Sequence, residues 1–226
     1  RPASLVHPGR RMNWYGNDTQ RARATALLNA LLGNWGMKGG LFLSAGMNFA
    51  GYGFPKFPAA TRPKVDNPNG RWPFADAEVT TGLREATITG KPYPIKGWVV
   101  YASNLIQTLP NEKETIEAIN KLDLLVVVET HPSELAGYAD VILPDTSFIE
   151  RHDDLYVGWG RQGWTALRQP AVAPPGEQKP AWWIAKQLGE RLGVGQYMPF
   201  KDMDEYLAAR CEKSGIDYAK LKKEGI

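Results

Sequence analysis

Residues 97–143 read GWVVYASNLIQTLPNEKETIEAINKLDLLVVVETHPSELAGYADVIL, and this stretch decides the fold of the chain. Its apolar runs lie at 97–102, 124–129 and 140–143, and its helical patterns lie at 111–121 and 132–138. Continuous apolar runs are typical of strands that are buried on both faces of a parallel sheet. The order strand, helix, strand, helix, strand predicts right-handed crossover connections. We therefore expect an α/β fold with three layers, a Rossmann-like parallel sheet and long irregular loops.

The rest of the chain is organised around this stretch. We expect a loop and helix at 1–40, an irregular loop region at 41–95, a nucleotide-cradling βαβ domain at 96–195 and a helical tail at 196–226. The helix is predicted at 18–32. Its apolar side chains recur at helical spacing, which predicts that they form part of the core: Ala24, Leu27, Leu28, Leu31 and Leu32.

The region 41–95 is rich in proline and glycine, so we expect it to have little regular structure and to be poorly packed on its own. Its aromatic side chains should form an exposed patch: Phe54, Phe57, Trp72 and Phe74. In the tail, Cys211 lies on the inner face of a predicted helix and is expected in the core.

Composition excludes several classes of protein. The formal net charge of the 226 residues is +3, and Lys and Arg are scattered, which argues against a nucleic-acid partner. No apolar run approaches the roughly 20 residues of a membrane-spanning helix. The single Cys211 excludes an internal disulfide and a cysteine-rich metal site within this chain. The chain begins at Arg1 without a signal-peptide pattern, so we expect an excerpt or a processed product.

The predicted strand ends carry the candidate binding residues. Ligands of open parallel sheets sit at the carboxyl ends of the strands, which here are followed by Ser103-Asn104, Glu129-Thr130 and Pro144-Asp145. Glu129 is placed to accept hydrogen bonds from a nucleotide, or it only caps a strand. The first crossover lacks a G-x-G-x-x-G loop, which argues against ordinary NAD or FAD binding. The polar run ERHDD at 150–154 is either a solvated or interface loop or a metal site, and we favour the loop. His7 is either a loop residue or a ligand contact.

Four stretches together resemble the molybdopterin oxidoreductase family, which includes dimethyl sulfoxide reductase. They are HPGRRMNWYGNDTQRARATALLNALLGNWGMKGG, GWVVYASNLIQTLPN, LDLLVVVETHPSELAGYADVILPDTSFIERHDD and APPGEQKPAWWIAKQLGERLG. The resemblance covers nearly all of residues 5–195, and it is most similar to the polysulfide and thiosulfate reductase catalytic subunits.

The resemblance implies a cofactor and a place in a larger subunit. Family members hold molybdenum between two molybdopterin guanine dinucleotides (Mo-bis-MGD). This chain would follow the 4Fe-4S domain and the metal's protein ligand, and it would precede the C-terminal domain. No catalytic residue and no metal ligand is therefore expected within it, and the isolated chain is expected to be inactive.

The family's contacts are carried over by position. The cofactor-binding residues implied in this way, together with their neighbours at the strand ends, are Pro8, Gly9, Met12, Ser103, Asn104, Val128, Glu129, Thr130, Arg151 and Lys179. Arg151 would meet the diphosphate or ribose, and Asn104, Glu129 and Arg151 should converge on one crevice. Where the family has an acidic side chain that contacts guanine, this chain has Ala181. The neighbouring Lys179 or Trp182 would make that contact instead.

Partners and compartment are also implied by the resemblance alone. We expect the remainder of the catalytic subunit, an iron–sulfur electron-transfer subunit and a membrane anchor subunit as partners, in anaerobic respiration in the periplasm. The substrate would be a sulfur compound such as polysulfide or thiosulfate, or a related oxyanion. The alternatives are a free-standing, non-catalytic nucleotide-binding module and a structural scaffold for a partner subunit.

Overall fold

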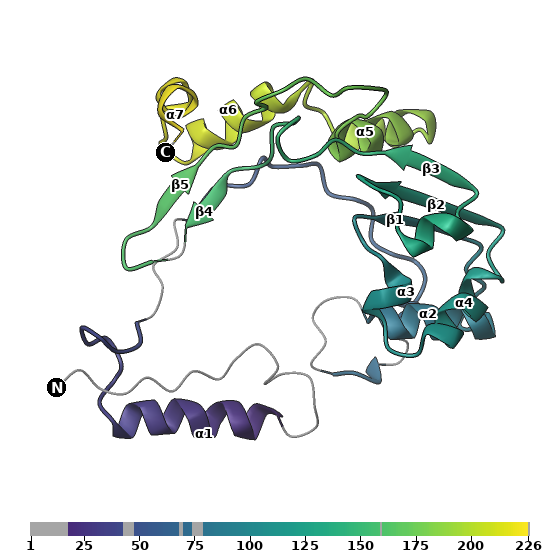
Figure 1. Cartoon of the computed structure of the whole chain (residues 1–226), viewed down its shortest axis with the longest axis horizontal. Coiled ribbons are helices and arrows are strands. Elements are labelled where there is room, and N and C mark those ends of the chain that lie inside the picture. The colour runs from purple at the N-terminus through teal and green to yellow at the C-terminus, as the bar shows by residue number, and fades with distance from the viewer. Residues whose placement is uncertain (1–17, 43–47, 68–69, 74–78, 159, 226) are drawn as a thin grey trace. The chain divides into compact units, whose positions relative to one another are not determined.

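The computed structural model describes residues 18–42, 48–67, 70–73, 79–158 and 160–225. Its elements (Figure 1) are α1 (Asp18–Leu31), α2 (Thr80–Thr89), β1 (Gly97–Tyr101), α3 (Leu105–Thr108), α4 (Glu112–Ile119), β2 (Leu124–Glu129), η3 (Glu134–Tyr138), β3 (Val141–Pro144), β4 (Tyr156–Gly158), β5 (Trp164–Ala166), α5 (Ala181–Arg191), η4 (Gly195–Tyr197), α6 (Met203–Lys213) and α7 (Tyr218–Glu224). Among the described residues, no helix is both long and apolar enough to cross a membrane.

The chain divides into two compact units. The first unit contains the described residues up to 50, together with 154–167 and 210–225, and the second contains 51–153 and 168–209. These units cut across the four predicted segments, because the chain leaves the second unit at 154, returns at 168 and leaves again at 210.

The second unit is built on the predicted parallel sheet, with strand order β1-β2-β3. Gly97 pairs with Leu124 at one end, and Glu129 pairs with Pro144 at the other. The three predicted strands are confirmed to within one residue at each end. The second predicted helix is a short 3-10 turn, η3, because Pro132 and Gly137 leave too few residues for an α-helix.

The two faces of this sheet are covered differently. On one face Trp98, Val100, Leu125 and Val127 are buried under α3, α4 and η3, and this is the hydrophobic core of the second unit. The opposite face carries Leu143 of β3, which lies across a cavity from α5. Figure 1 shows α2, α3 and α4 below the sheet and α5 beside β3, so helices flank the sheet on both sides.

A helix that the sequence analysis did not predict, α2, lies inside the region expected to be irregular. It begins without a side-chain cap and contains four threonines, which is a weak helical signal. Arg84 fixes it to α4: the guanidinium donates to the Glu114 carboxylate (2.7 Å) and to Thr115 Oγ1 (3.2 Å). Tertiary contacts rather than local propensity therefore account for this helix.

The side chains of Phe54 and Phe57 are exposed as predicted, but they are not isolated. Phe54 lies 6.1 Å from the ring of Phe200, and Phe57 stacks on Tyr197 with ring centroids 4.1 Å apart. Trp72 is also exposed, while Phe74 lies outside the described residues. The segment is irregular and still packs on the elements around α6, which corrects the expectation of a poorly packed loop.

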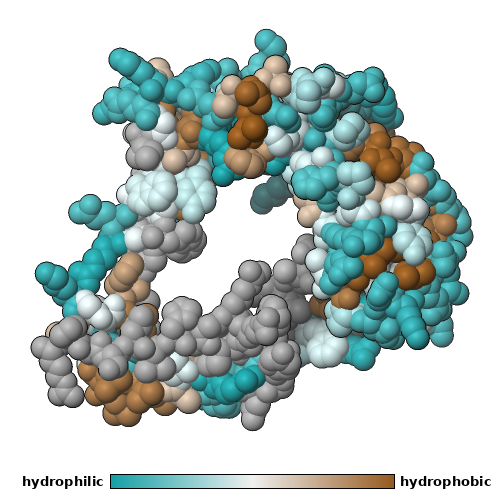
Figure 2. Space-filling view, in the orientation of Figure 1, coloured by the Kyte–Doolittle hydropathy of each residue, from teal (hydrophilic) through white to brown (hydrophobic). Residues whose placement is uncertain are grey.

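The first unit contains α1, the hairpin β4-β5 and α7. The expected burial of the leucine stripe on α1 is wrong for the described residues: Leu27, Leu28, Leu31 and Leu32 are all exposed, Leu31 by 85%. The stripe has helical spacing, but no described element covers it, and Figure 2 shows a hydrophobic patch on the surface at α1. By contrast, Cys211 on α6 is fully buried, as predicted. Burial raises the pKa of its thiol, an effect that the neighbouring Asp154 reinforces and Arg210 opposes.

Candidate functional site

The carboxyl ends of the three parallel strands lie at one edge of the sheet, as the register requires. Ligands of open α/β sheets bind at this edge. Directly after β1, Ala102 adopts φ = 49°, a left-handed conformation that costs a non-glycine residue about 1–2 kcal/mol. Such strained positions cluster at ligand-binding sites. The turn at Ala102 starts the segment that carries Ser103 and Asn104.

Asn104 presents an unused acceptor at the end of β1. Its Nδ2 donates to the carboxylate of Glu134, while its Oδ1 is buried and has no hydrogen-bond partner in the described part of the chain. The pKa of Glu134 is lowered by its own backbone N–H and by Asn104, with a smaller contribution from Gln107. Because Glu134 holds the amide group of Asn104 in place, the position of Oδ1 is fixed although this atom accepts no hydrogen bond from the described residues. A buried acceptor in that state is a candidate ligand contact.

Glu129 closes β2 and is half-buried. Its Oε1 accepts from the backbone N–H of Thr130 (2.9 Å) and from Thr130 Oγ1 (3.3 Å), and this hydroxyl also lies 3.0 Å from His131 Nδ1. No hydrogen bond from the described residues reaches its other carboxylate oxygen, Oε2. The side chain of Val128 is buried, and its carbonyl accepts from Ala102 N (3.0 Å). Val128 therefore supports the edge, while Glu129 offers it a carboxylate.

An ion-pair network occupies the end of β3. Arg151 Nη1 donates to Asp145 Oδ2 (2.7 Å) and to the Thr146 carbonyl (2.6 Å), and its Nε donates to Asp153 Oδ1 (2.8 Å). Asp153 Oδ2 in turn accepts from Arg168 Nη1 (2.6 Å). Burial alone would lower the pKa of Arg151, but the hydrogen bonds and charges of Asp153 and Asp145 raise it. The arginine in the ERHDD run is thus an internal partner for carboxylates, and no group of three or more potential metal-binding side chains occurs among the described residues.

Tyr101 links the end of β1 to this network. The pKa of its phenol is raised by burial and by the nearby Asp145 carboxylate, while the charge of Arg151 lowers it. The sequence analysis places Asp145 at a strand end but does not count it among the cofactor contacts, and Tyr101 was not predicted as a site residue.

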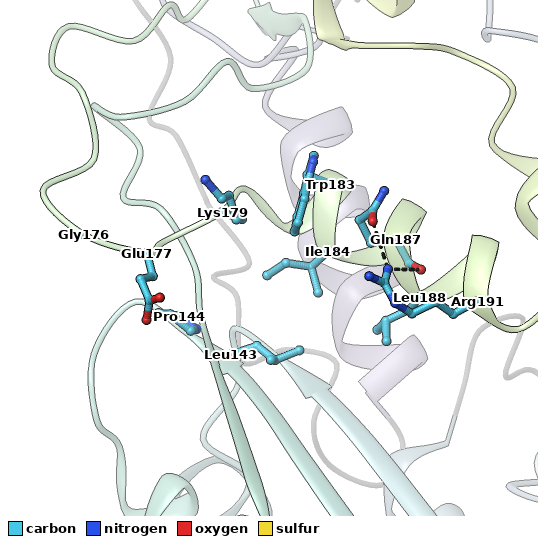
Figure 3. Close-up of a pocket in the computed structure, with 10 residues that line it drawn as sticks. All are labelled: Leu143, Pro144, Gly176, Glu177, Lys179, Trp183, Ile184, Gln187, Leu188 and Arg191. Carbon is cyan, nitrogen blue, oxygen red and sulfur yellow. Dashed lines mark hydrogen bonds between the residues drawn. The ribbon is translucent and has the colours of Figure 1, made fainter.

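A cavity of about 550 Å³ adjoins the same strand end, between β3 and α5 (Figure 3). It is lined by Leu143, Pro144, Gly176, Glu177, Lys179, Trp183, Ile184, Gln187, Leu188 and Arg191. Lys179 is tied to the strand end, since its backbone N–H donates to the Pro144 carbonyl (3.1 Å), and its Nζ lies 5.8 Å from the Trp183 ring centroid. Arg191 donates to the Gln187 carbonyl (3.1 Å) and Oε1 (2.9 Å). An apolar cavity lined by two cations and one carboxylate, Glu177, suits a ligand that has a flat apolar part and an anionic group.

The predicted site residues therefore form two groups. Asn104 and Glu129 lie at the ends of neighbouring strands β1 and β2, and Arg151 and Lys179 lie around Asp145 at the end of β3. Asn104, Glu129 and Arg151 form their hydrogen bonds with residues outside this set of three. Their convergence on one crevice therefore stays a prediction. Trp182 packs against Phe200 (5.9 Å) rather than lining the cavity. Pro8, Gly9, Met12 and His7 lie outside the described residues.

Comparison with known proteins gives consistent matches. Residues 3–191 match the family model of molybdopterin oxidoreductases. The thiosulfate reductase molybdopterin-containing subunit of Salmonella typhimurium is 33% identical over 217 residues, which cover 89% of this chain and 29% of that protein. A probable dimethyl sulfoxide reductase chain of Escherichia coli is 28% identical over 94% of this chain and 28% of its own length.

A solved structure agrees with the sequence matches. Acetylene hydratase from Pelobacter acetylenicus superposes with a TM-score of 0.54 and 28% identity, over 64% of this chain and 20% of that chain. The chain thus spans less than a third of the length of these relatives.

Proposed function

Because the chain belongs to the molybdopterin oxidoreductase family, we propose that it is a cofactor-cradling part of the catalytic subunit of a molybdenum-dependent oxidoreductase. The cofactor would be a molybdopterin guanine dinucleotide. When bound, it supplies the two-electron chemistry, and this chain supplies binding and orientation.

The observation that carries the proposal is the pair of acceptors at adjacent strand ends. The buried, unpartnered Oδ1 of Asn104 and the carboxylate of Glu129 fit a ligand edge that offers parallel N–H donors. Guanine has such an edge, with N1–H beside its exocyclic amine, and hydrogen bonds to a carboxylate are among the stronger ones. The residues present therefore fit the guanine end of the cofactor.

The finer assignments extend the proposal. The 33% sequence identity to a thiosulfate reductase subunit supports a sulfur compound, such as thiosulfate or polysulfide, or a related oxyanion as substrate. We further propose a second guanine dinucleotide on the metal, a 4Fe-4S cluster elsewhere in the subunit, electron-transfer and membrane anchor subunits as partners, and a periplasmic location. A C-x2-C-x3-C pattern upstream in the reading frame would support the cluster, and a reading frame without one would contradict it.

The test compares Glu129→Ala with Glu129→Gln in the full-length subunit. Each charge-assisted hydrogen bond contributes roughly 1.5–3 kcal/mol, so the alanine variant should retain at most about a tenth as much cofactor. The glutamine variant keeps one acceptor and should retain an intermediate amount. Guanine nucleotide and molybdenum are measured per polypeptide, with the exposed Glu117→Ala on α4 as the control. Full occupancy in Glu129→Ala would mean that the carboxylate only caps β2.

A further inference from the structure

Two cations flank the end of β3, and their surroundings differ. Both Arg151 and Lys179 are attached to the same point, Asp145: Arg151 through its side chain, and Lys179 through a backbone bridge beside Pro144. A phosphate at this edge could meet either side chain. The contacts that each cation already makes decide between them.

Arg151 is already neutralised within the chain. Two carboxylates hold it, Asp145 at 2.7 Å and Asp153 at 2.8 Å, and Nη1 also donates to the Thr146 carbonyl. Asp145 is only 3% exposed. If Arg151 turned toward an external anion, Asp145 would remain buried without its counter-charge, which is strongly unfavourable. With Arg168 paired to Asp153, the network contains two positive and two negative groups and offers no excess charge to a phosphate.

Lys179 has no such partner. No carboxylate of the described residues forms an ion pair with it, and its side chain is exposed beside the Trp183 ring at the cavity. Its backbone is nevertheless fixed, because its N–H donates to the Pro144 carbonyl at 3.1 Å. The side chain therefore starts from a fixed point at the carboxyl edge and ends in an uncompensated ammonium group (Figure 3).

We propose that Lys179 is the cation at the end of β3 that binds a phosphate of the cofactor, and that Arg151 is a positioning residue that locks the strand end through Asp145. The assignment rests on the proposed function. It replaces the diphosphate contact that the family resemblance implied for Arg151. A point charge on a flexible stem suits phosphate binding, whereas the planar fork of Arg151 suits its two fixed carboxylates.

The experiment measures binding of guanosine and of guanosine diphosphate to the 226-residue chain by ligand-observed NMR. Lys179→Gln should weaken guanosine diphosphate about fivefold, as expected for an exposed ion pair, and leave guanosine unchanged. Lys179→Arg should restore the diphosphate affinity. Lys113→Gln, an exposed lysine on α4, is the matched control and should change neither.

Arg151 is tested without and with nucleotide. Arg151→Gln and Arg151→Lys should lower the urea midpoint of the nucleotide-free chain and leave the ratio of the two affinities unchanged. The lysine variant keeps the positive charge and serves if the glutamine variant does not fold.

Two results would overturn the assignment while leaving the proposed function standing. One is an unchanged diphosphate affinity in Lys179→Gln. The other is a selective loss of diphosphate affinity in an Arg151 variant whose urea midpoint is unchanged. If the unsubstituted chain binds neither guanosine nor guanosine diphosphate, the proposed function fails, and this assignment fails with it.

Discussion

The apolar run of β2 and the leucine stripe of α1 carry similar hydrophobic signals and have opposite environments. Leu125 in β2 is 1% exposed, whereas Leu31 in α1 is exposed almost completely. β2 lies between β1 and β3, and helices from the same hundred residues cover the face that carries Leu125. Nothing among the described residues covers the leucines of α1 in the same way.

The difference shows what a hydrophobic pattern specifies. Periodicity predicts which face of an element is to be covered, but it does not identify what covers it. For β2 the partners follow within one crossover, so pattern and packing agree. For α1 the pattern predicts a face to be covered, but no described residue covers it.

The largest effect should come from a matched pair of leucine truncations. Leu125→Ala opens a cavity among Trp98, Val127 and Ala118, so the free energy of unfolding of the 226-residue chain should fall by about 2–5 kcal/mol. Leu31→Ala removes an exposed side chain and should change it by less than about 0.5 kcal/mol. Urea unfolding followed by circular dichroism measures both. Equal losses in the two variants would mean that α1 is covered as fully as the sheet.

A smaller effect is expected for two arginines around α2. The Arg84 side chain is 8% exposed and bonds Glu114 and Thr115, whereas Arg71 is 60% exposed and pairs with Glu85 at 3.1 Å. Arg84→Met should lower the free energy of unfolding by about 2–3 kcal/mol, because it removes the hydrogen bonds that a buried, charged guanidinium makes to Glu114 and Thr115. Arg71→Met should cost at most about 1 kcal/mol, as exposed pairs do. If Arg71→Met proved the more costly, packing would not explain why α2 forms.

The parts of the fold that were predicted depend on residues that are close together in the sequence. Strand, crossover and strand follow each other within 97–144, so the three parallel strands and their bounds could be predicted from the pattern. Helix α2 was not, since it depends on the long-range bonds of Arg84 to 110–115. The hairpin β4-β5 was also missed, because its strands are only three residues long and a glycine-rich sequence gives them little β-signal.

In the candidate site, too, some features could be predicted from the sequence and others could not. Asn104 and Glu129 could be found because topology places strand ends together. The state of Arg151 could not, since it depends on the path of the loop after β3, which brings Asp145 and Asp153 to one guanidinium. Spacing in the sequence names the charges at an edge, but only the folded loop shows which of them are already paired.

The smallest expected effect concerns Tyr101, on the face of the sheet opposite Leu125. Burial and the Asp145 carboxylate raise the pKa of its phenol in the folded chain, so the protonated form is favoured there. The resulting stabilisation is fully present below the ordinary tyrosine pKa of about 10 and is lost as the pH rises through the higher folded-state value.

Near-ultraviolet absorbance during alkaline titration measures this ionisation directly. The difference between the unsubstituted chain and Tyr101→Phe should isolate a phenol that titrates above the ordinary tyrosine range. Asp145→Asn keeps the size of the side chain and removes its charge, so it should move the Tyr101 titration downward. A Tyr101 component in the ordinary range, or one that Asp145→Asn leaves unchanged, would mean that the phenol does not share the buried network at the end of β3. The phenol of Tyr101 would then be as independent of its neighbours as the exposed leucines of α1.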